Sequence, residues 1–351
     1  MWSESLNRRP NRDPAPCGLV CAMRAARPIL EAMTSPYPLL LTGVLLAGCA
    51  SQQGQRIEAI TLGSTPPSEP QLVDHGPINS GLGERDATLS PDGNTFAWTV
   101  THRRESVIVM MNRVNGSWGE PYIAPFSGLH ADLEPCFSPH SGALWFCSQR
   151  PLPGESEAGD WNLWRVWPQA PIGPASSWGA PVAVDALNTE GDEFYPSITK
   201  DGRMCFTATR TGGLGGEDIW LAQEMGPGED GWDVRNAGPS INTSAGEFNS
   251  CLHPTGCALV FGSDRSGGGD LFVSRFREGA WLPSSPLEIA NSPGLDYCPS
   301  FSPDGATFWF TSRRSLGRSH GDLRHWRSHR MSPGNGLDDL YWVTGDWATG
   351  D

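Results

Sequence analysis

The sequence predicts an all-β fold, and three observations lead to this prediction. Gly and Pro, with 42 and 31 copies, make up about a fifth of the 351 residues, and both interrupt helices. Charged residues are only 18% of the chain, which nevertheless holds 15 Trp, a composition typical of folded proteins. A segment of strand–turn–strand character also recurs five times, which is the signature of a repeat architecture.

Each of the five copies begins with an acidic residue and continues through a short strand to a turn of Pro-Asp-Gly or a variant. A second strand, rich in aromatic residues, follows the turn. Gly suits such a turn because it accepts a positive φ, and Asp because it bonds to its own backbone. The copies begin at Glu84, Asp132, Glu193, Glu247 and Asp296, and their turns are anchored at Pro91, Pro139, Lys200, Pro254 and Pro303.

Two further strands complete each copy. A third strand is predicted at 107–113, 162–167, 218–223, 270–275 and 339–344, and a fourth follows Trp118, Trp178, Trp232 and Trp281. The last copy lacks a fourth strand, but residues 70–81 resemble one and precede the first copy. Four-stranded units of this length are propeller blades. We therefore predict a single β-propeller over 68–351, with five four-stranded blades and the N-terminal strand closing the last blade. Six blades, the sixth using residues 55–66, are the alternative.

The N-terminal region predicts export. Residues 38–47 form an apolar run that suits a signal peptide and is too short to span a bilayer. The run ends in Leu-Ala-Gly-Cys at 46–49, which resembles the lipobox of bacterial lipoproteins and implies lipidation of Cys49. We predict a lipoprotein signal peptide over 1–49, with its true start at Met23 or Met33, and a polar tether over 50–67. An ordinary signal peptide is the alternative.

The repeats also resemble a known family. The Ser-Pro-Asp-Gly turns, the Ser/Thr-x-Arg strand ends, GLGGEDIW at 213–220 and INTSAGEF at 241–248 are similar to TolB-type, WD-like propeller repeats. The resemblance covers about 70–345 and implies a bacterial envelope protein. Together with Ala50 and Ser51 after the lipobox, it places the chain on the periplasmic side of the outer membrane.

The acids that open the five copies are interpreted as structural. Four copies end their second strand in Arg, at Arg150, Arg210, Arg265 and Arg314, and the first has His102. One acid and one Arg per blade suggest charge-assisted hydrogen bonds. The alternative is that some of the acids line the central channel and hold Ca²⁺. Apart from that alternative, we expect no cofactor and no metal.

Two other features concern cysteines and a basic segment. Cys251 and Cys257 flank a turn symmetrically and are a possible disulfide in an oxidising periplasm. The insertion at 313–336 departs from the repeat and concentrates positive charge in a chain of net charge −14. We predict that it docks on an anionic envelope component or partner through Arg313, Arg314, Arg318, Arg324, Arg327 and Arg330.

These features favour a binding function over an enzymatic one. The negative net charge disfavours binding to nucleic acid, and the lipid anchor is the expected membrane attachment. The sequence contains no Gly-x-Ser-x-Gly nucleophile motif and no dinucleotide or phosphate loop, so we assign no catalytic residue. We predict a non-enzymatic envelope scaffold that binds a protein or ligand. The alternative is a propeller glycoside hydrolase, sialidase-like or five-bladed, which would need two open carboxylates.

Overall fold

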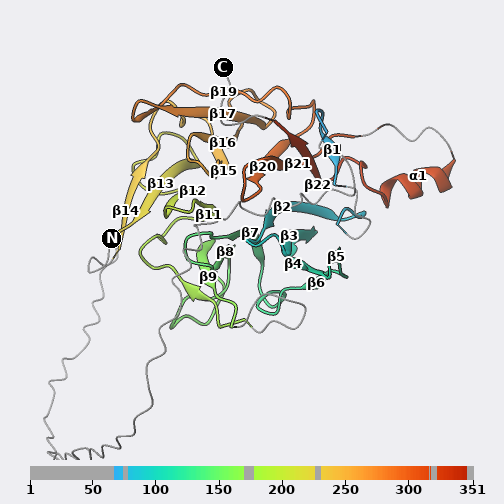
Figure 1. The fold of residues 1–351 in the computed structure, drawn as a ribbon, viewed down its shortest axis with the longest axis horizontal. Helices are drawn as coiled ribbons and strands as arrows, with labels where there is room; N and C mark the ends of the chain where they lie inside the picture. The colour runs from blue at the N-terminus through green and yellow to red at the C-terminus, as the bar shows by residue number, and fades with distance from the viewer. Residues whose placement is uncertain are drawn as a thin grey trace, which may run out of the picture. The chain divides into compact units, whose positions relative to one another are not determined.

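Each repeat folds into one antiparallel sheet, and the five sheets form the ring of a five-bladed β-propeller (Figure 1). The computed structural model describes residues 67–73, 78–169, 178–225, 231–315, 317 and 322–345. The innermost strands of successive blades contact one another in the order β2, β7, β11, β15, β20 and back to β2. The ring is therefore closed, and the prediction of five blades instead of six is confirmed.

The first four blades follow chain order from the axis outward. Blade 1 consists of β2 (Gly83–Leu89), β3 (Thr95–His102), β4 (Glu105–Val114), β5 (Ser117–Trp118) and β6 (Tyr122–Ile123). Blade 2 consists of β7 (Asp132–Phe137), β8 (Leu144–Ser148), β9 (Asn162–Val166) and β10 (Val182–Ala183). Blade 3 consists of β11 (Glu193–Ile198), β12 (Arg203–Ala208), β13 (Asp218–Glu224) and β14 (Trp232–Asn236). Blade 4 consists of β15 (Glu247–Leu252), β16 (Ala258–Ser263), β17 (Asp270–Arg277), β18 (Ala280–Trp281) and β19 (Ser285–Pro286).

Blade 5 is assembled from both ends of the repeat region. Its strands are β20 (Asp296–Phe301), β21 (Thr307–Ser312), β22 (Asp339–Thr344) and β1 (Gln71–Leu72). β1 pairs antiparallel with β22 and opposes Gln71 to Trp342. The predicted closure by the N-terminal strand is thus confirmed, and it covers a sheet edge that would otherwise be open.

The hydrophobic core lies between the blades. Five clusters of buried side chains each combine residues from two neighbouring blades. The cluster between blades 5 and 1, for example, includes Trp98 and Trp309, which are at most 1% exposed. Because each blade buries apolar faces against two neighbours, the ring is stabilised as a unit.

A side-chain clamp repeats at the outer side of four blades. In each, an Asn five residues before the repeat acid bonds to the backbone of a third strand. Asn79 Nδ2 donates to the Leu340 carbonyl at 3.0 Å, and Asn79 Oδ1 accepts from the Leu340 N–H at 2.8 Å. The other members are Asn188 with Leu163, Asn242 with Ile219, and Asn291 with Leu271. These clamps replace ladder hydrogen bonds where the short fourth strand ends.

The insertion between β21 and β22 contains a helix, α1 (Leu323–Arg330), where sequence analysis expected a loop. Asp322 caps it by accepting hydrogen bonds from the backbone N–H groups of Arg324 and His325. Neither Gly nor Pro occurs within the helix. No helix in the described ranges has the length and apolar character that crossing a membrane requires.

Candidate functional site

Five residues on the innermost strands form the axial ring. Two residues after its repeat acid, each innermost strand has a register shift and a residue in the left-handed backbone region. These residues are Asp86 (φ 64°), Glu134 (60°), Tyr195 (50°), Asn249 (48°) and Cys298 (52°). The left-handed region costs a non-Gly residue roughly 1–2 kcal/mol, and such strained residues concentrate at functional sites. Here the bulge turns one side chain per blade toward the axis.

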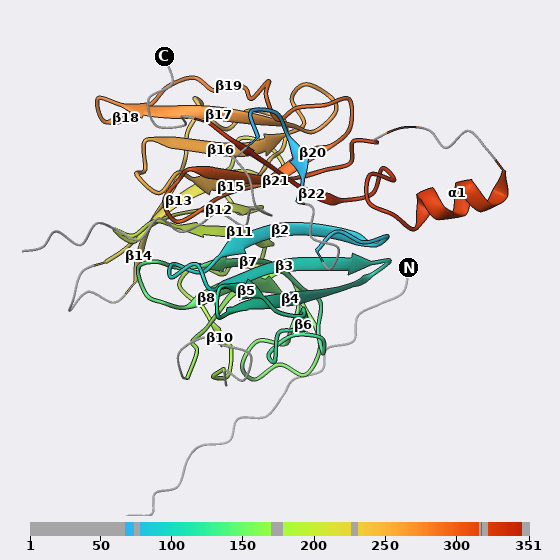
Figure 2. The same cartoon turned by 45° about the vertical axis from the view of Figure 1, so that its right-hand side comes forward.

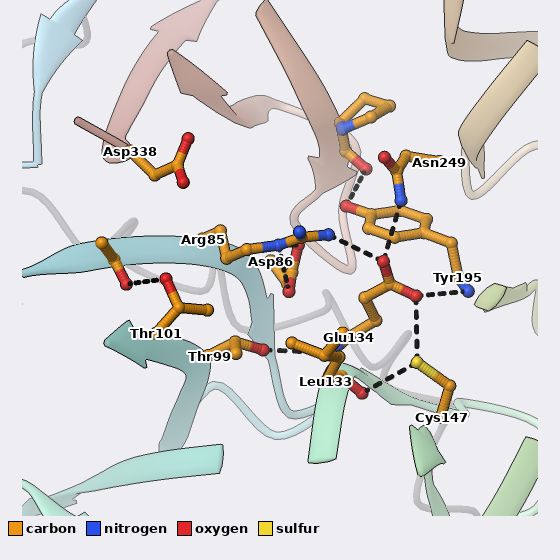
Figure 3. Close-up of polar contacts among 12 residues, drawn as sticks. Arg85, Asp86, Thr99, Thr101, Leu133, Glu134, Cys147, Tyr195, Asn249 and Asp338 are labelled. Atoms are coloured by element: carbon orange, nitrogen blue, oxygen red, sulfur yellow. Dashed lines mark hydrogen bonds and ion pairs between the residues drawn. The ribbon is translucent and has the colours of Figure 1, made fainter. Parts of the chain in front are cut away.

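The axial ring is joined by a buried network around Arg85 (Figure 3). The Arg85 Nε donates to both carboxylate oxygens of Asp86 at 2.8 Å, and its Nη2 donates to Glu134 Oε1 at 2.7 Å. Glu134 also accepts from the backbone N–H of Tyr195 at 2.8 Å and from Asn249 Nδ2 at 3.0 Å. The network therefore connects blades 1, 2, 3 and 4, while the Tyr195 hydroxyl donates to the Pro299 carbonyl of blade 5 at 3.0 Å.

Burial determines the charge state of this network. Burial raises the pKa of the Glu134 carboxyl to about 7, although the Arg85 guanidinium acts in the opposite direction. Burial likewise raises the pKa of the Tyr195 and Cys298 side chains. Glu134 can thus take up a proton near neutral pH while Arg85 keeps its charge. The network seals the axis with polar groups that already have partners inside the protein.

Beside this seal the axis widens into a cavity of about 450 Å³, here called the axial cavity. All five blades line it, through residues at two equivalent positions of each blade. The deeper position holds Thr88, Cys136, Ser197, Cys251 and Ser300, and the mouth holds the five turn anchors Pro91, Pro139, Lys200, Pro254 and Pro303. A smaller cavity of about 20 Å³, lined by Glu134 and Tyr195 among others, lies between the axial ring and this space.

The lining of the axial cavity is suited to binding. Its walls combine hydroxyl and thiol groups with apolar side chains such as Ile198 and Leu252. Among the described lining residues, Asp304 is the one carboxylate and none is a histidine. Asp304 itself accepts hydrogen bonds from Ser302 and Ala306 in its own turn. Burial raises the pKa of Cys136 to about 12 and that of Cys251 to about 11, so both thiols stay protonated and weakly nucleophilic at neutral pH.

The repeat acids are not among the residues that line this cavity, and four of the five pair with Arg. Within their blades, Asp132–Arg150, Glu193–Arg210, Glu247–Arg265 and Asp296–Arg314 are separated by 2.6, 3.5, 3.1 and 3.0 Å. Each Arg also lies over two aromatic rings; Arg150, for example, is 4.8 Å from Phe146 and 5.3 Å from Trp164. This stacking explains why Arg occupies the position, because a Lys ammonium lacks the planar group that stacks.

Glu84 of blade 1 differs because His102, at the position of Arg, is exposed. The Glu84 carboxylate accepts hydrogen bonds from the backbone and hydroxyl of Ser80 instead, and burial raises its pKa. The five acids are therefore engaged within the blades and do not face the axis. Among the residues that the structure describes, no three His, Cys, Asp or Glu side chains are placed to hold a metal ion.

The predicted docking residues fall into two groups. Arg314 is the blade Arg that pairs with Asp296, and Arg313 pairs with Asp338 at 2.6 Å, so these two belong to blade 5 and not to the docking segment. Arg324, Arg327 and Arg330 lie on α1. Arg318 lies outside the described residues, as does Cys49.

The predicted disulfide between Cys251 and Cys257 is not formed. The strand register places Cys251 opposite Val260, and the Cys251 thiol is free and accepts a hydrogen bond from Ser197 of blade 3 at 3.5 Å. Leu252 pairs with Leu259, so the hairpin turn is centred between Thr255 and Gly256 and Cys257 lies within the turn, which keeps it from facing Cys251.

Sequence analysis missed the axial ring and Arg85 altogether. A signal was present, because the residue two positions after each repeat acid is Asp, Glu, Tyr, Asn or Cys, whereas the acid recurs in all five copies and the Pro of the turn in four. A position that varies among the copies of an otherwise regular repeat indicates side chains that do not stabilise the individual blade.

The chain is similar to several solved structures at low sequence identity. The sequence matches no protein-family model, and no curated protein is significantly similar to it. The TolB structure from Agrobacterium tumefaciens is 13% identical with a TM-score of 0.45 and covers 76% of this chain and 91% of its own. TolB from Acinetobacter baumannii is 14% identical with a TM-score of 0.41, over 76% of this chain and 55% of that one. An α-L-arabinofuranosidase from Lactobacillus brevis is 10% identical with a TM-score of 0.45, over 78% and 93%.

Proposed function

We propose that the protein is a non-catalytic binding protein of the bacterial cell envelope, anchored through Cys49, and that its axial cavity receives a short segment of a partner protein. The observation that carries the proposal is the axial cavity itself. It is lined by all five blades and sealed on one side by the axial ring. A volume of about 450 Å³ lies within the range of binding pockets and holds a few side chains.

The charges around the axis support binding over hydrolysis. A glycosidase needs two carboxylates that reach the sugar, separated by roughly 5–10 Å. Here Asp86 and Glu134 are at most 4% exposed and share Arg85, and four repeat acids are paired with Arg. The axial cavity instead offers Lys200 at its mouth, the hydroxyl of Ser300 deeper inside and apolar surface, which suit a peptide with polar backbone and small side chains.

The test fills the axial cavity without disturbing the blades. Ser300 is partly exposed and lines the cavity, so Ser300→Phe should occlude it while the ring stays folded. The matched control is Ser117→Phe, on the exposed short strand β5 of blade 1. Membrane-anchored parent and both variants would be cross-linked in envelope preparations, and captured proteins quantified by mass spectrometry, with a soluble Cys49→Ser form as a further control.

The expected result is a defined partner whose capture falls about tenfold or more with Ser300→Phe and is unchanged with Ser117→Phe. Purified parent and Ser300→Phe would also be assayed on a panel of glycosides. Hydrolysis by the parent that Ser300→Phe abolishes would overturn the proposal in favour of the glycosidase. Equal capture by both Phe variants would show that the axial cavity is not the binding site.

A further inference from the structure

Seven of the eight residues of the helix α1 are exposed, and His329 is half-buried. None of its eight residues is buried, and it stands away from the five sheets (Figure 2). An isolated helix of this length is marginal in water, because most helices are stabilised by packing an apolar face. The capping by Asp322 accounts for where α1 begins but not for what its side chains contact.

The side chains of α1 are apolar and basic. Leu323 and Trp326 are 60% and 48% exposed, and Met331, directly after the helix, is 75% exposed. Between Leu323 and Arg330 the helix has three Arg and two His and no acid. Leu323, Trp326, Arg327 and Arg330 follow the spacing i, i+3, i+4 and i+7, so they share one face, and the Arg330 guanidinium lies 5.6 Å from the Trp326 ring.

This combination is typical of helices that lie in the interface of a bilayer. Trp and Leu enter the boundary between headgroups and acyl chains, while Arg extends its charged end toward phosphate. The charge of α1 is opposite to that of the whole chain, which carries −14. Arg103 and Arg104, exposed at the β3–β4 turn of neighbouring blade 1, add positive charge on the side to which α1 extends (Figure 2).

The predicted lipid anchor joins the same blade. The Thr344 N–H, at the end of β22, donates to the Pro67 carbonyl at 3.1 Å, and α1 precedes the other end of β22. The six residues of β22 span about 20 Å. The 17 residues from 50 to 66 extend at most about 60 Å, with a random-coil average of about 23 Å. A chain lipidated at Cys49 can therefore place α1 on the bilayer that holds the anchor.

We propose that α1 is an interfacial helix that docks on an anionic phospholipid bilayer. Leu323, Trp326 and Met331 enter the interface, and Arg324, Arg327 and Arg330 contact lipid phosphates. α1 joins the end of blade 5 where Ser312 faces Asp339, whereas the turn at Pro303 that forms part of the axial mouth is at the opposite end. Docking of α1 therefore directs the mouth of the axial cavity away from the bilayer. On the proposed function, the mouth then stays accessible to a partner protein.

The test measures flotation of the full chain with vesicles, using Cys49→Ala as the parent so that no lipid anchor contributes. Vesicles contain phosphatidylcholine alone or mixed with phosphatidylglycerol, at low and at raised salt. Arg324→Ser/Arg327→Ser should weaken binding to the anionic vesicles about thirtyfold, since each basic residue near the surface contributes about fivefold. The matched control, Arg203→Ser/Arg235→Ser, removes the same charge from blade 3 and should change little.

A second variant tests insertion. Leu323→Ser/Trp326→Ser keeps all charges and should weaken binding to anionic vesicles about tenfold or more, and raised salt should not restore it. No α1 residue is buried, so melting temperatures should stay unchanged. Failure of the parent to float with anionic vesicles, or equal binding by the Arg324/Arg327 and control variants, would overturn the proposal. Ser300→Phe should bind vesicles like the parent, which separates this result from the fate of the proposed function.

Discussion

The five innermost strands carry two sets of equivalent residues: the repeat acids and, two residues later, the axial ring. The first set is chemically uniform and the second is not. The repeat acids keep one chemistry, and four of them pair with an Arg of their own blade that lies over two aromatic rings. The axial ring keeps one backbone conformation but carries Asp, Glu, Tyr, Asn and Cys. The acids are spread around the ring inside separate blades, whereas the axial side chains meet at one point.

Geometry explains this difference. Five carboxylates converging on one axis would repel one another in a medium of low dielectric, so the same acid in every blade is unfavourable there. Inside the blades four of the acids each have their own Arg and Glu84 is bonded by Ser80, so repetition carries no such cost. The repeat acids therefore stabilise the blades, whereas the axial ring carries chemistry that is specific to this protein.

The largest expected effect is at the repeat acids. Arg150→Met should lower the free energy of unfolding by about 3–5 kcal/mol, because it leaves the fully buried Asp132 carboxylate without its partner at 2.6 Å. Urea unfolding measures the change. The control is Arg313→Met, whose ion pair with Asp338 involves a half-exposed side chain and should contribute less than about 1 kcal/mol. Equal losses in the two variants would contradict the structural role of the repeat pairs.

Sequence reasoning was sufficient for the fold because the repeat positions recur. The five acids, their turns and the lone strand near residue 71 predicted five blades and the closure, with six blades as the alternative, and β22 has the bounds predicted for it. Residues that set the backbone geometry and the burial of a blade recur at the same positions of each copy, so a periodic sequence pattern reveals them. The clamp residue Asn79 and its equivalents also recur, five residues before four of the five acids, but their role depends on a contact with a distant strand.

The site was less predictable because it depends on unlike residues from different blades. Arg85 meets Glu134 only after the ring closes, and no spacing along the chain encodes that contact. The bulges are equally hidden, since a non-Gly residue such as Tyr195 gives no sign of a positive φ. The centre of a turn is also hard to predict: the hairpin turns between Thr255 and Gly256, so Cys251 faces Val260 and not Cys257.

The second largest expected effect comes from Glu134 of the axial ring and is a dependence of the free energy of unfolding on pH. Burial raises the pKa of Glu134 from its ordinary 4.5 to about 7, so between these values the folded protein keeps a proton that the unfolded chain has lost. Stability should therefore fall as pH rises from about 5 to 7, by on the order of 3 kcal/mol, and then level off. Urea unfolding across this range measures it, and Glu134→Gln should reduce the slope.

Asp339 provides the comparison outside the axis. Burial raises its pKa to about 7, although the Gly334 N–H at 2.9 Å acts against it, so its effect on stability has the same sign. Blade 2 has Asn162 at the equivalent position, which makes Asp339→Asn a mild substitution. Each single variant should remove part of the slope and the double variant more. A slope in the double variant as steep as in the parent would rule out both carboxyls as its source.

The smallest effect concerns how the blades hold the axial ring in its strained conformation. Thr207 and Thr311 occupy equivalent positions of β12 and β21, and both are at most 1% exposed. The Thr207 hydroxyl accepts a hydrogen bond from the backbone N–H of Asn249, in the axial ring of the next blade, at 2.9 Å. The Thr311 hydroxyl is buried with no partner within the described residues.

Val has nearly the shape of Thr, so the two substitutions compare a hydroxyl that supports the axial ring with one that does not. Thr207→Val should cost about 1–3 kcal/mol because it leaves the Asn249 N–H unsatisfied. Thr311→Val should be neutral or slightly stabilising, since it removes a buried polar group without a partner. Thermal unfolding of both variants decides the matter. A larger loss for Thr311→Val than for Thr207→Val would show that these hydroxyls act on packing and not on the axial ring.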